Sequence, residues 1–238
     1  MGSTAGGDEG GNAIPCYEQI YALAGPTQTW RIIGGNDIKE DIDDTISFLN
    51  RYYKDHGPNG GYYSHIDPVT FDAHAESLGV NKAKKNWNSV GDHAPAYLIN
   101  LYLATGDENY GTFLEDTFDT ICDHFPDYGY SPFMNEKFFD DWSHDLKWGI
   151  HQARCVVGHN LKVAWNLTRM HSLMPKESYK TFAHQIADAI PAAGCDNQRG
   201  GWYDMMERTL KDGEENYRRV WHDRKAWWQQ EQGILAYY

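Results

Sequence analysis

Apolar residues recur at helical spacing along most of this chain, and the pattern predicts three helix–turn–helix units. One further apolar helix is predicted over residues 226–238. Gly35, Gly106 and Pro175 mark the three turns at intervals of 71 and 69 residues. So regular a period indicates an array in which each hairpin buries its apolar face against its neighbours. The predicted helix pairs are 16–33 with 38–53, 95–105 with 110–124, and 158–173 with 179–190.

A polar, glycine-rich loop follows each returning helix. The loops at 60–65 and 200–205 both place two glycines before alternating aromatic and polar residues, Gly-Gly-Tyr-Tyr-Ser-His and Gly-Gly-Trp-Tyr-Asp-Met. Glycine permits a tight turn and the alternation suits a short β-hairpin. Because function is often carried by loops on a rigid scaffold, we expect the site on the rim that carries these loops.

Composition narrows the classes of protein that fit. The 238 residues can form one domain, predicted over 15–238 after a flexible, glycine-rich segment at 1–14. The net charge of -13 argues against nucleic-acid binding. No apolar run reaches membrane-spanning length and no signal pattern is present, so we expect a cytoplasmic protein without a membrane partner. Four scattered cysteines and no tight His/Asp spacing predict neither a disulfide framework nor a metal, and we expect no cofactor.

Two histidines occupy matching places in successive units. His159 opens the first helix of the third unit, where the positive end of a helix favours a neutral, proton-accepting imidazole. His93 precedes the corresponding helix one unit earlier, and two histidines facing one pocket can serve as an acid–base pair. The alternatives are a helix-end histidine beside the core for His159, and a helix start capped by Asp92 for His93.

A third cluster combines an indole with a carboxylate. Trp228 and Glu231 are three residues apart and share a helix face. An indole can stack on a sugar ring while a carboxylate accepts its hydroxyls; the alternative is a packed tryptophan pair with a solvated glutamate. Glycoside hydrolysis would instead need two carboxylates flanking one bond, and the candidate acids are Asp140, Asp141, Asp204 and Glu207.

Four segments, in this order along the chain, together resemble the N-acylglucosamine 2-epimerase family, which includes cellobiose 2-epimerases and aldose–ketose isomerases. They are residues 86–93, which begin with NWN and end with His93, then GHNLKVAW at 158–165, GGWYD at 200–204 and KAWWQQE at 225–231. The resemblance implies an all-α, (α/α)6-barrel-like toroid of helical hairpins with a sugar site at its axis. It also implies proton transfer at carbon 2 of an aldose through an enediol, without a redox cofactor.

By the same resemblance, His159 matches the histidine of the family's Gly-His-x-x-Glu motif and His93 matches a second catalytic histidine. Asn88 or Ser89 matches a substrate-contacting asparagine, and Trp202 and Trp228 match walls of the sugar site. The residues expected to bind substrate are Trp87, Asn88, Trp202, Asp204, Trp228 and Glu231.

Two departures from the family pattern keep alternatives open. Lys162 stands where the motif has glutamate, and the chain stops before a final hairpin that carries another catalytic histidine. We therefore expect a partial barrel without its last hairpin or hairpins. The function is expected to be a histidine-dependent sugar epimerase or isomerase. The alternatives are a silent carbohydrate-binding or oligomer-forming module, completed by a second copy or another chain segment, and an (α/α)-barrel glycoside hydrolase.

Overall fold

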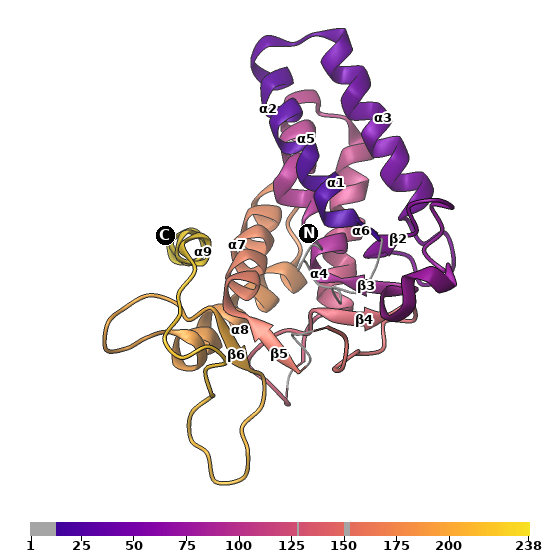
Figure 1. Ribbon diagram of the computed structural model, residues 1–238. Coiled ribbons are helices and arrows are strands. Elements are labelled where there is room, and N and C mark those ends of the chain that lie inside the picture. Colours follow the sequence, from indigo (N-terminus) through magenta and orange to yellow (C-terminus); the bar gives the residue numbers. More distant parts are fainter. Residues whose placement is uncertain (1–12, 128, 150–152) are drawn as a thin grey trace. The chain divides into compact units, whose positions relative to one another are not determined.

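The computed structural model describes residues 13–127, 129–149 and 153–238, which form two compact units (Figure 1). The first unit contains residues 13–117 and 137–149. The second contains residues 118–127, 129–136 and 153–238. Most of the segment predicted to be flexible, 1–14, lies outside the described residues, and the single domain over 15–238 stays a prediction.

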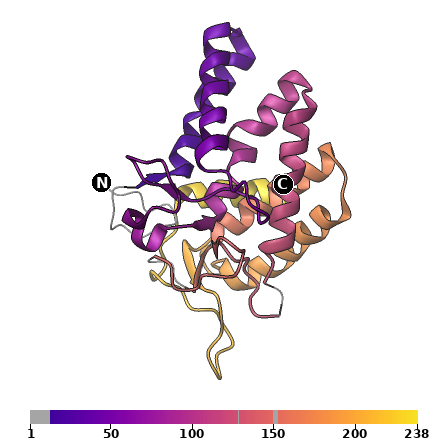
Figure 2. The same cartoon turned by 90° about the vertical axis from the view of Figure 1, so that its right-hand side faces the viewer.

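The first two predicted hairpins begin in the first unit, and Figures 1 and 2 show α2 and α3 side by side. The turn between them depends on glycine, because Gly34 and Gly35 have φ values of 70° and 109°. Gly106, with φ of 65°, ends α5 in the left-handed conformation typical of a helix C-terminus. The helices are α1 (Cys16–Ala22), α2 (Ala24–Ile33), α3 (Asn36–Tyr52), the 3₁₀ helix η1 (Glu76–Asn81), α4 (Trp87–Val90), the π-helix η2 (Ala94–Leu98), α5 (Ile99–Thr105) and α6 (Glu108–His124).

The third hairpin and the last helix lie in the second unit, where α6 also ends. They are α7 (Val157–Leu173), α8 (Glu177–Gly194) and α9 (Trp227–Tyr237), and α7 packs against both α8 and α9. Leu161, Leu167 and Met170 of α7 are fully buried, as are Tyr179 and Ile190 of α8. The helical spacing of these residues is the apolar face that the sequence pattern predicts.

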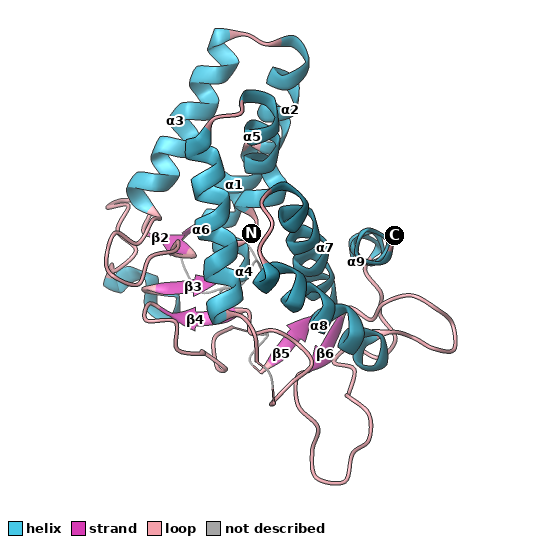
Figure 3. Ribbon diagram, turned by 180° about the vertical axis from the view of Figure 1, so that it is seen from behind, coloured by secondary structure: helices cyan, strands magenta, loops and turns pink. Residues whose placement is uncertain are grey.

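Three short antiparallel strand pairs bring together segments that are distant in the sequence (Figure 3). They are β1 (Ile14–Pro15) with β2 (His65–Ile66), β3 (Lys84–Asn86) with β4 (Lys137–Phe139), and β5 (Arg154–Val156) with β6 (Met205–Glu207). β5 leads directly into α7. The pairing of β5 with β6 therefore holds the first turn of α7 beside the segment that precedes β6.

The two glycine–aromatic loops share one internal arrangement, which supports the repeat read from the sequence. In the first unit, Lys85 Nζ donates to Asp55 Oδ2 at 2.7 Å. In the second unit, Lys225 Nζ donates to Asp196 Oδ2, also at 2.7 Å. Each aspartate lies before its glycine pair and each lysine lies two positions before a tryptophan. An ion pair thus closes both loops at the same relative position.

Within the described ranges, no helix is both long and apolar enough to cross a membrane. Across the same residues, no group of three or more histidine, cysteine, aspartate and glutamate side chains is arranged to hold a metal ion.

Candidate functional site

His159 in the first turn of α7 is in direct contact with Glu136. His159 Nδ1 lies 2.6 Å from Glu136 Oε2, and the other carboxylate oxygen accepts the backbone N–H of Val156 at 3.0 Å. The side chains are 16% and 10% exposed, respectively. A carboxylate can only accept, so Nδ1 carries a proton, and in the neutral ring Nε2 carries the lone pair. Glu136 therefore both satisfies the start of the helix and selects the tautomer of the imidazole.

Asp204, immediately before β6, is the second acidic group near His159. Arg224 Nε lies 2.8 Å from Asp204 Oδ2, and the Gln229 side-chain amide donates to Oδ1 and, at 3.1 Å, to the Asp204 carbonyl. Burial raises the pKa of Asp204, while Arg224, Gln229 and His159 act in the opposite direction. The other end of the Gln229 amide accepts the Gly158 N–H at 2.6 Å. Gln229 thus ties α9, the start of α7 and Asp204 together.

Trp228 of α9 forms an aromatic wall beside His159. The ring centroids of Trp228 and His159 lie 5.6 Å apart, at an interplanar angle of 41°. This approach depends on Gly158, because a Cβ there would collide with the side chains of Trp228 and Gln229. The neighbouring Trp227 is 74% exposed. Within the second unit, His159, Glu136, Asp204 and Trp228 therefore form one partly buried cluster, which we call the His159 cluster.

The two other predicted sugar-contacting residues of this unit lie elsewhere on or beside α9. Trp202 stacks on Tyr237, with centroids 5.6 Å apart and the rings within 10° of parallel. Its backbone N–H and carbonyl bond to the Gln230 side chain, at 2.7 and 3.0 Å. Glu231 is exposed on α9. Trp202 thus anchors α9, and its predicted contact with a sugar stays a prediction, as does that of Glu231.

His93 lies in the core of the first unit. Its side chain is fully buried; Nδ1 lies 2.7 Å from Tyr97 Oη and Nε2 lies 3.1 Å from the Ser89 carbonyl. A carbonyl only accepts, so Nε2 donates and Nδ1 accepts from the tyrosine, and both nitrogens are satisfied in the neutral ring. Burial lowers the pKa of His93 to about 3. Within its unit the geometry favours a structural histidine.

The remaining predicted residues of the first unit are also enclosed. Trp87 is 1% exposed and Asn88 is 9% exposed, with its amide donating to Asp92 Oδ2 at 3.0 Å. Their predicted sugar contacts stay predictions. So does the predicted meeting of His93 with His159, which belong to different units.

The acids considered for glycoside hydrolysis have other partners. Asp141 accepts from the backbone and hydroxyl of Ser143, and these bonds lower its pKa. A general acid needs the opposite shift. Lys85 bonds the backbone carbonyl of Asp140, and Glu207 pairs with Arg154 at 3.2 Å. Burial raises the pKa of Asp204, the fourth of these acids, and the hydrolase alternative stays a prediction.

No motif in the sequence predicts a role for Glu136. The resemblance drew attention to Lys162, three residues after His159, because the family motif has its glutamate there. In the structure the carboxylate reaches the imidazole from 23 residues earlier in the chain. The sequence feature that could have pointed to Glu136 is its place as an acid in a segment rich in apolar side chains, between Asn135 and Lys137, which are both buried.

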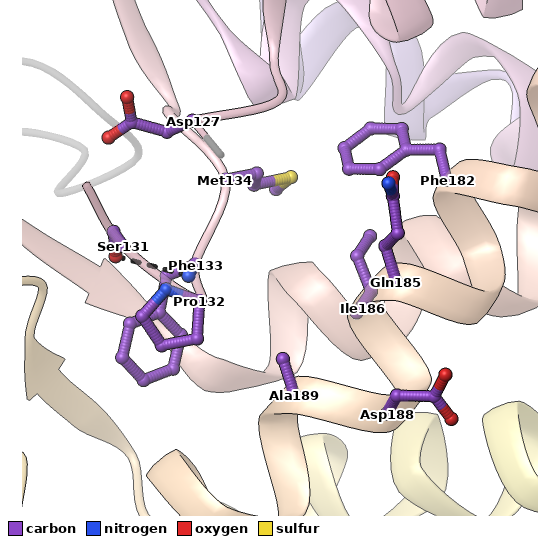
Figure 4. A pocket seen from close by; sticks show the side chains of 10 residues that line it. All are labelled: Asp127, Ser131, Pro132, Phe133, Met134, Phe182, Gln185, Ile186, Asp188 and Ala189. Atoms are coloured by element: carbon purple, nitrogen blue, oxygen red, sulfur yellow. Dashed lines mark hydrogen bonds between the residues drawn. The ribbon is translucent and has the colours of Figure 1, made fainter. Parts of the chain in front are cut away.

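A hollow of about 360 Å³ lies between α8 and the segment that leads to Glu136 (Figure 4). Residues of α8 form one wall, and residues before Glu136 form the other. Figure 4 shows Phe182 and Met134 pointing into it from opposite sides. Its lining residues are Asp127, Ser131, Pro132, Phe133, Met134, Phe182, Gln185, Ile186, Asp188 and Ala189.

Comparison with known proteins identifies the fold. No family model and no curated protein matches the chain. Among solved structures, a D-mannose isomerase matches with a TM-score of 0.73 and 18% identity, over 95% of this chain and 53% of that chain. A cellobiose 2-epimerase from Bacillus thermoamylovorans B4167 matches with a TM-score of 0.70 and 15% identity, over 94% and 59%. An inactive variant of the GH76A alpha-1,6-mannanase of Salegentibacter sp. HEL1_6 matches with a TM-score of 0.57 and 17% identity, over 80% of this chain and 50% of that chain.

The chain spans about half the length of the solved structures that it matches. At these identities the likeness shows the fold alone. The all-α, (α/α)-barrel-type architecture predicted from the hairpin repeat is confirmed, and so is the resemblance to the N-acylglucosamine 2-epimerase family at the level of fold.

Proposed function

We propose that this protein is a sugar 2-epimerase or aldose–ketose isomerase that moves a proton at carbon 2 of an aldose or sugar derivative, with His159 as the base. The observation that carries the proposal is the 2.6 Å contact between His159 Nδ1 and Glu136. It leaves Nε2 as the basic nitrogen and places a carboxylate where an imidazolium would form. The fold shared with a D-mannose isomerase and a cellobiose 2-epimerase supports a sugar as the substrate.

In the proposed reaction, His159 Nε2 takes the proton from carbon 2. The electron pair of the C–H bond forms the C1–C2 double bond of an enediol, while the carbonyl oxygen at carbon 1 receives a proton. Return of a proton to the opposite face of carbon 2, with loss of the proton on the carbon-1 oxygen, gives the epimer. Delivery of a proton to carbon 1, with loss of the proton from the carbon-2 hydroxyl, gives the ketose. Glu136 stabilises the imidazolium during the intermediate.

The other members of the His159 cluster have proposed binding roles. Trp228 offers an indole face for the apolar side of a sugar ring. Asp204, held by Arg224 and Gln229, offers a carboxylate to the sugar hydroxyls. His93 remains the proposed donor to the carbonyl oxygen, although its Nε2–H is bonded to the Ser89 carbonyl in the structure. Action in the cytoplasm is likewise part of the proposal.

The test is proton exchange at carbon 2. Wild type and His159→Ala are incubated with mannose, glucose and cellobiose in deuterated water, and deuterium at carbon 2 is followed by NMR. Exchange is expected in the wild type and lost in the variant, while His184→Ala, which changes an exposed histidine of α8, keeps it. Exchange at the wild-type rate in His159→Ala would remove His159 from the mechanism.

A silent module that assembles with another chain is the second candidate, and one surface favours it. Trp227, Ile234 and Leu235 of α9 are 74%, 65% and 54% exposed, an unusual density of large apolar side chains on one short helix. Size-exclusion chromatography of the wild type and of Ile234→Lys at several protein concentrations tests this candidate. A monomer at all concentrations, unchanged by the substitution, would count against assembly through α9.

A further inference from the structure

Arg208 is a buried cation directly after β6. It is 4% exposed, and its guanidinium makes three bonds to one stretch of chain. Nη1 donates to Asn135 Oδ1 at 2.6 Å, and Nη2 donates to Asp127 Oδ2 at 2.5 Å and to the Phe133 carbonyl at 3.0 Å. One side chain therefore fastens the stretch at three points, and one of them, Asn135, is next to Glu136 in the sequence.

The segment held in this way, residues 129–136, borders a hollow. The hollow of about 360 Å³ separates part of it from α8 (Figure 4). From the side of α7, Asn160 Oδ1 accepts the Met134 N–H at 2.9 Å. The bond from Met134 to Asn160 and the bonds to Arg208 therefore hold this segment beside the hollow.

The strand that precedes Arg208 also connects to the other acid of the cluster. Asp204 lies directly before β6 and Arg208 directly after it. β6 pairs in register with β5, Val156 opposite Met205 and Arg154 opposite Glu207, and β5 runs into α7. The same short strand therefore sets Asp204 at one end and, through Arg208, the Glu136 segment at the other.

We infer that Arg208 is a positioning residue for His159: it clamps the Glu136 segment so that the Glu136 carboxylate meets Nδ1 and fixes the imidazole tautomer. The expected effect of Arg208 on the reaction rate rests on the proposed function, whereas its expected effect on the His159 tautomer does not. Arginine suits the clamp because its planar fork of donors can serve several acceptors at fixed angles. Lysine is a point charge on a flexible stem and can replace only part of this geometry.

The experiment reads the tautomer directly. The ring nitrogens of 15N-histidine-labelled protein are recorded by NMR at alkaline pH without substrate, and the His159 signals are assigned by their loss in His159→Gln. The wild type is expected to show a protonated Nδ1 and an unprotonated Nε2. Arg208→Met is expected to show averaged or exchanged signals, and Arg208→Lys an intermediate pattern.

Three further variants make the result decisive. Glu136→Ala removes the acceptor itself and gives the reference 15N signals of His159 without the Glu136 carboxylate. Asp127→Asn loses one ion pair at low risk to folding, and covers the case in which Arg208→Met does not fold. Arg199→Met, which removes an exposed arginine paired with Asp223, is the matched control and should match the wild type. A folded Arg208→Met or Asp127→Asn protein with wild-type ring signals, while Glu136→Ala differs, would overturn the inference.

Carbon-2 exchange provides the second readout. Arg208→Met is expected to lower kcat about 10- to 100-fold, as misplacement of a catalytic group does, with KM changed less than twofold. A wild-type protein with no exchange on any sugar would contradict the proposed function and leave the tautomer result standing. A changed tautomer with unchanged kcat would refute the kinetic part of the inference.

Discussion

His159 and Glu136 are joined through Nδ1 and Oε2 at 2.6 Å, although they come from different elements and lie 23 residues apart in the sequence. The contact lies where β5 runs into α7, and the second carboxylate oxygen of Glu136 accepts the Val156 N–H there. Movement of Glu136 would therefore change both the imidazole orientation and the start of the helix. Lys162 does not deprive His159 of a carboxylate partner, because Glu136 supplies one from another direction.

Glu136→Gln should separate the charge of this residue from its hydrogen bonding. The amide oxygen can still accept from Nδ1, but the imidazolium loses its counter-charge, so we expect carbon-2 exchange to fall about 100-fold or more. Glu215→Gln, in an exposed loop of the same unit, should keep the wild-type rate. An exchange rate within twofold of wild type in Glu136→Gln would show that the carboxylate charge has no part in the reaction.

Trp228→Ala should weaken sugar binding more than it slows the chemical step. Loss of one aromatic stacking surface corresponds to about 1.4 kcal/mol, or about a tenfold rise in KM. The matched control is Trp227→Ala on the same helix, since that indole is 74% exposed and lies outside the His159 cluster. Equal KM values for the two variants would argue against a sugar-binding role for Trp228.

The helices could be predicted from the sequence because their signals are local. A repeated apolar face and a glycine at Gly35 or Gly106 are enough to place a hairpin, and the observed helices α3, α5 and α6 end or begin within two residues of the predictions. The strand pairs could not be predicted in the same way. β5 and β6 have three residues each and are about 50 positions apart, so no local pattern identifies the partner.

The two histidines show why the site was harder to predict than the fold. His93 and His159 take matching places in the repeat, so the sequence treats them alike. Their surroundings differ: Tyr62 and Phe113 enclose His93, with ring centroids 4.4 and 5.3 Å away, whereas His159 keeps 16% of its side chain exposed. Those contacts come from separate elements, and spacing around either histidine does not encode them.

Gly158→Ala should destabilise the protein. A Cβ at this position would overlap the side chains of Gln229 and Trp228, so α9 must shift or the cluster must repack, at a cost of about 1–3 kcal/mol. Gly25→Ala is the control, because it lies within helix α2 with no atom close to a new Cβ, and it should be neutral or stabilising by up to about 1 kcal/mol. Urea unfolding followed by circular dichroism measures both. Equal unfolding midpoints would mean that the approach of α9 does not depend on the glycine.

Acid should destabilise the folded protein through two buried histidines of the first unit. Burial lowers the pKa of His65 to about 4 and that of His93 to about 3, from an ordinary value of 6.5. Below pH 6.5 the unfolded chain therefore binds protons that the folded chain does not, and stability falls as the pH falls. Between pH 7 and pH 5 each histidine should remove about 2 kcal/mol from the free energy of unfolding.

Urea unfolding at pH 7, 6 and 5 measures this loss in the wild type, His65→Gln and His93→Gln. Each variant lacks one titrating group, so its stability should depend less steeply on pH even if the substitution lowers it at pH 7. His184→Gln, at an exposed position on α8, should follow the wild-type curve. A His93→Gln curve parallel to the wild type would show that His93 is not kept neutral by the fold. That outcome would return His93 to consideration as an accessible acid–base group, whereas a flattened curve with retained carbon-2 exchange would assign it to the core.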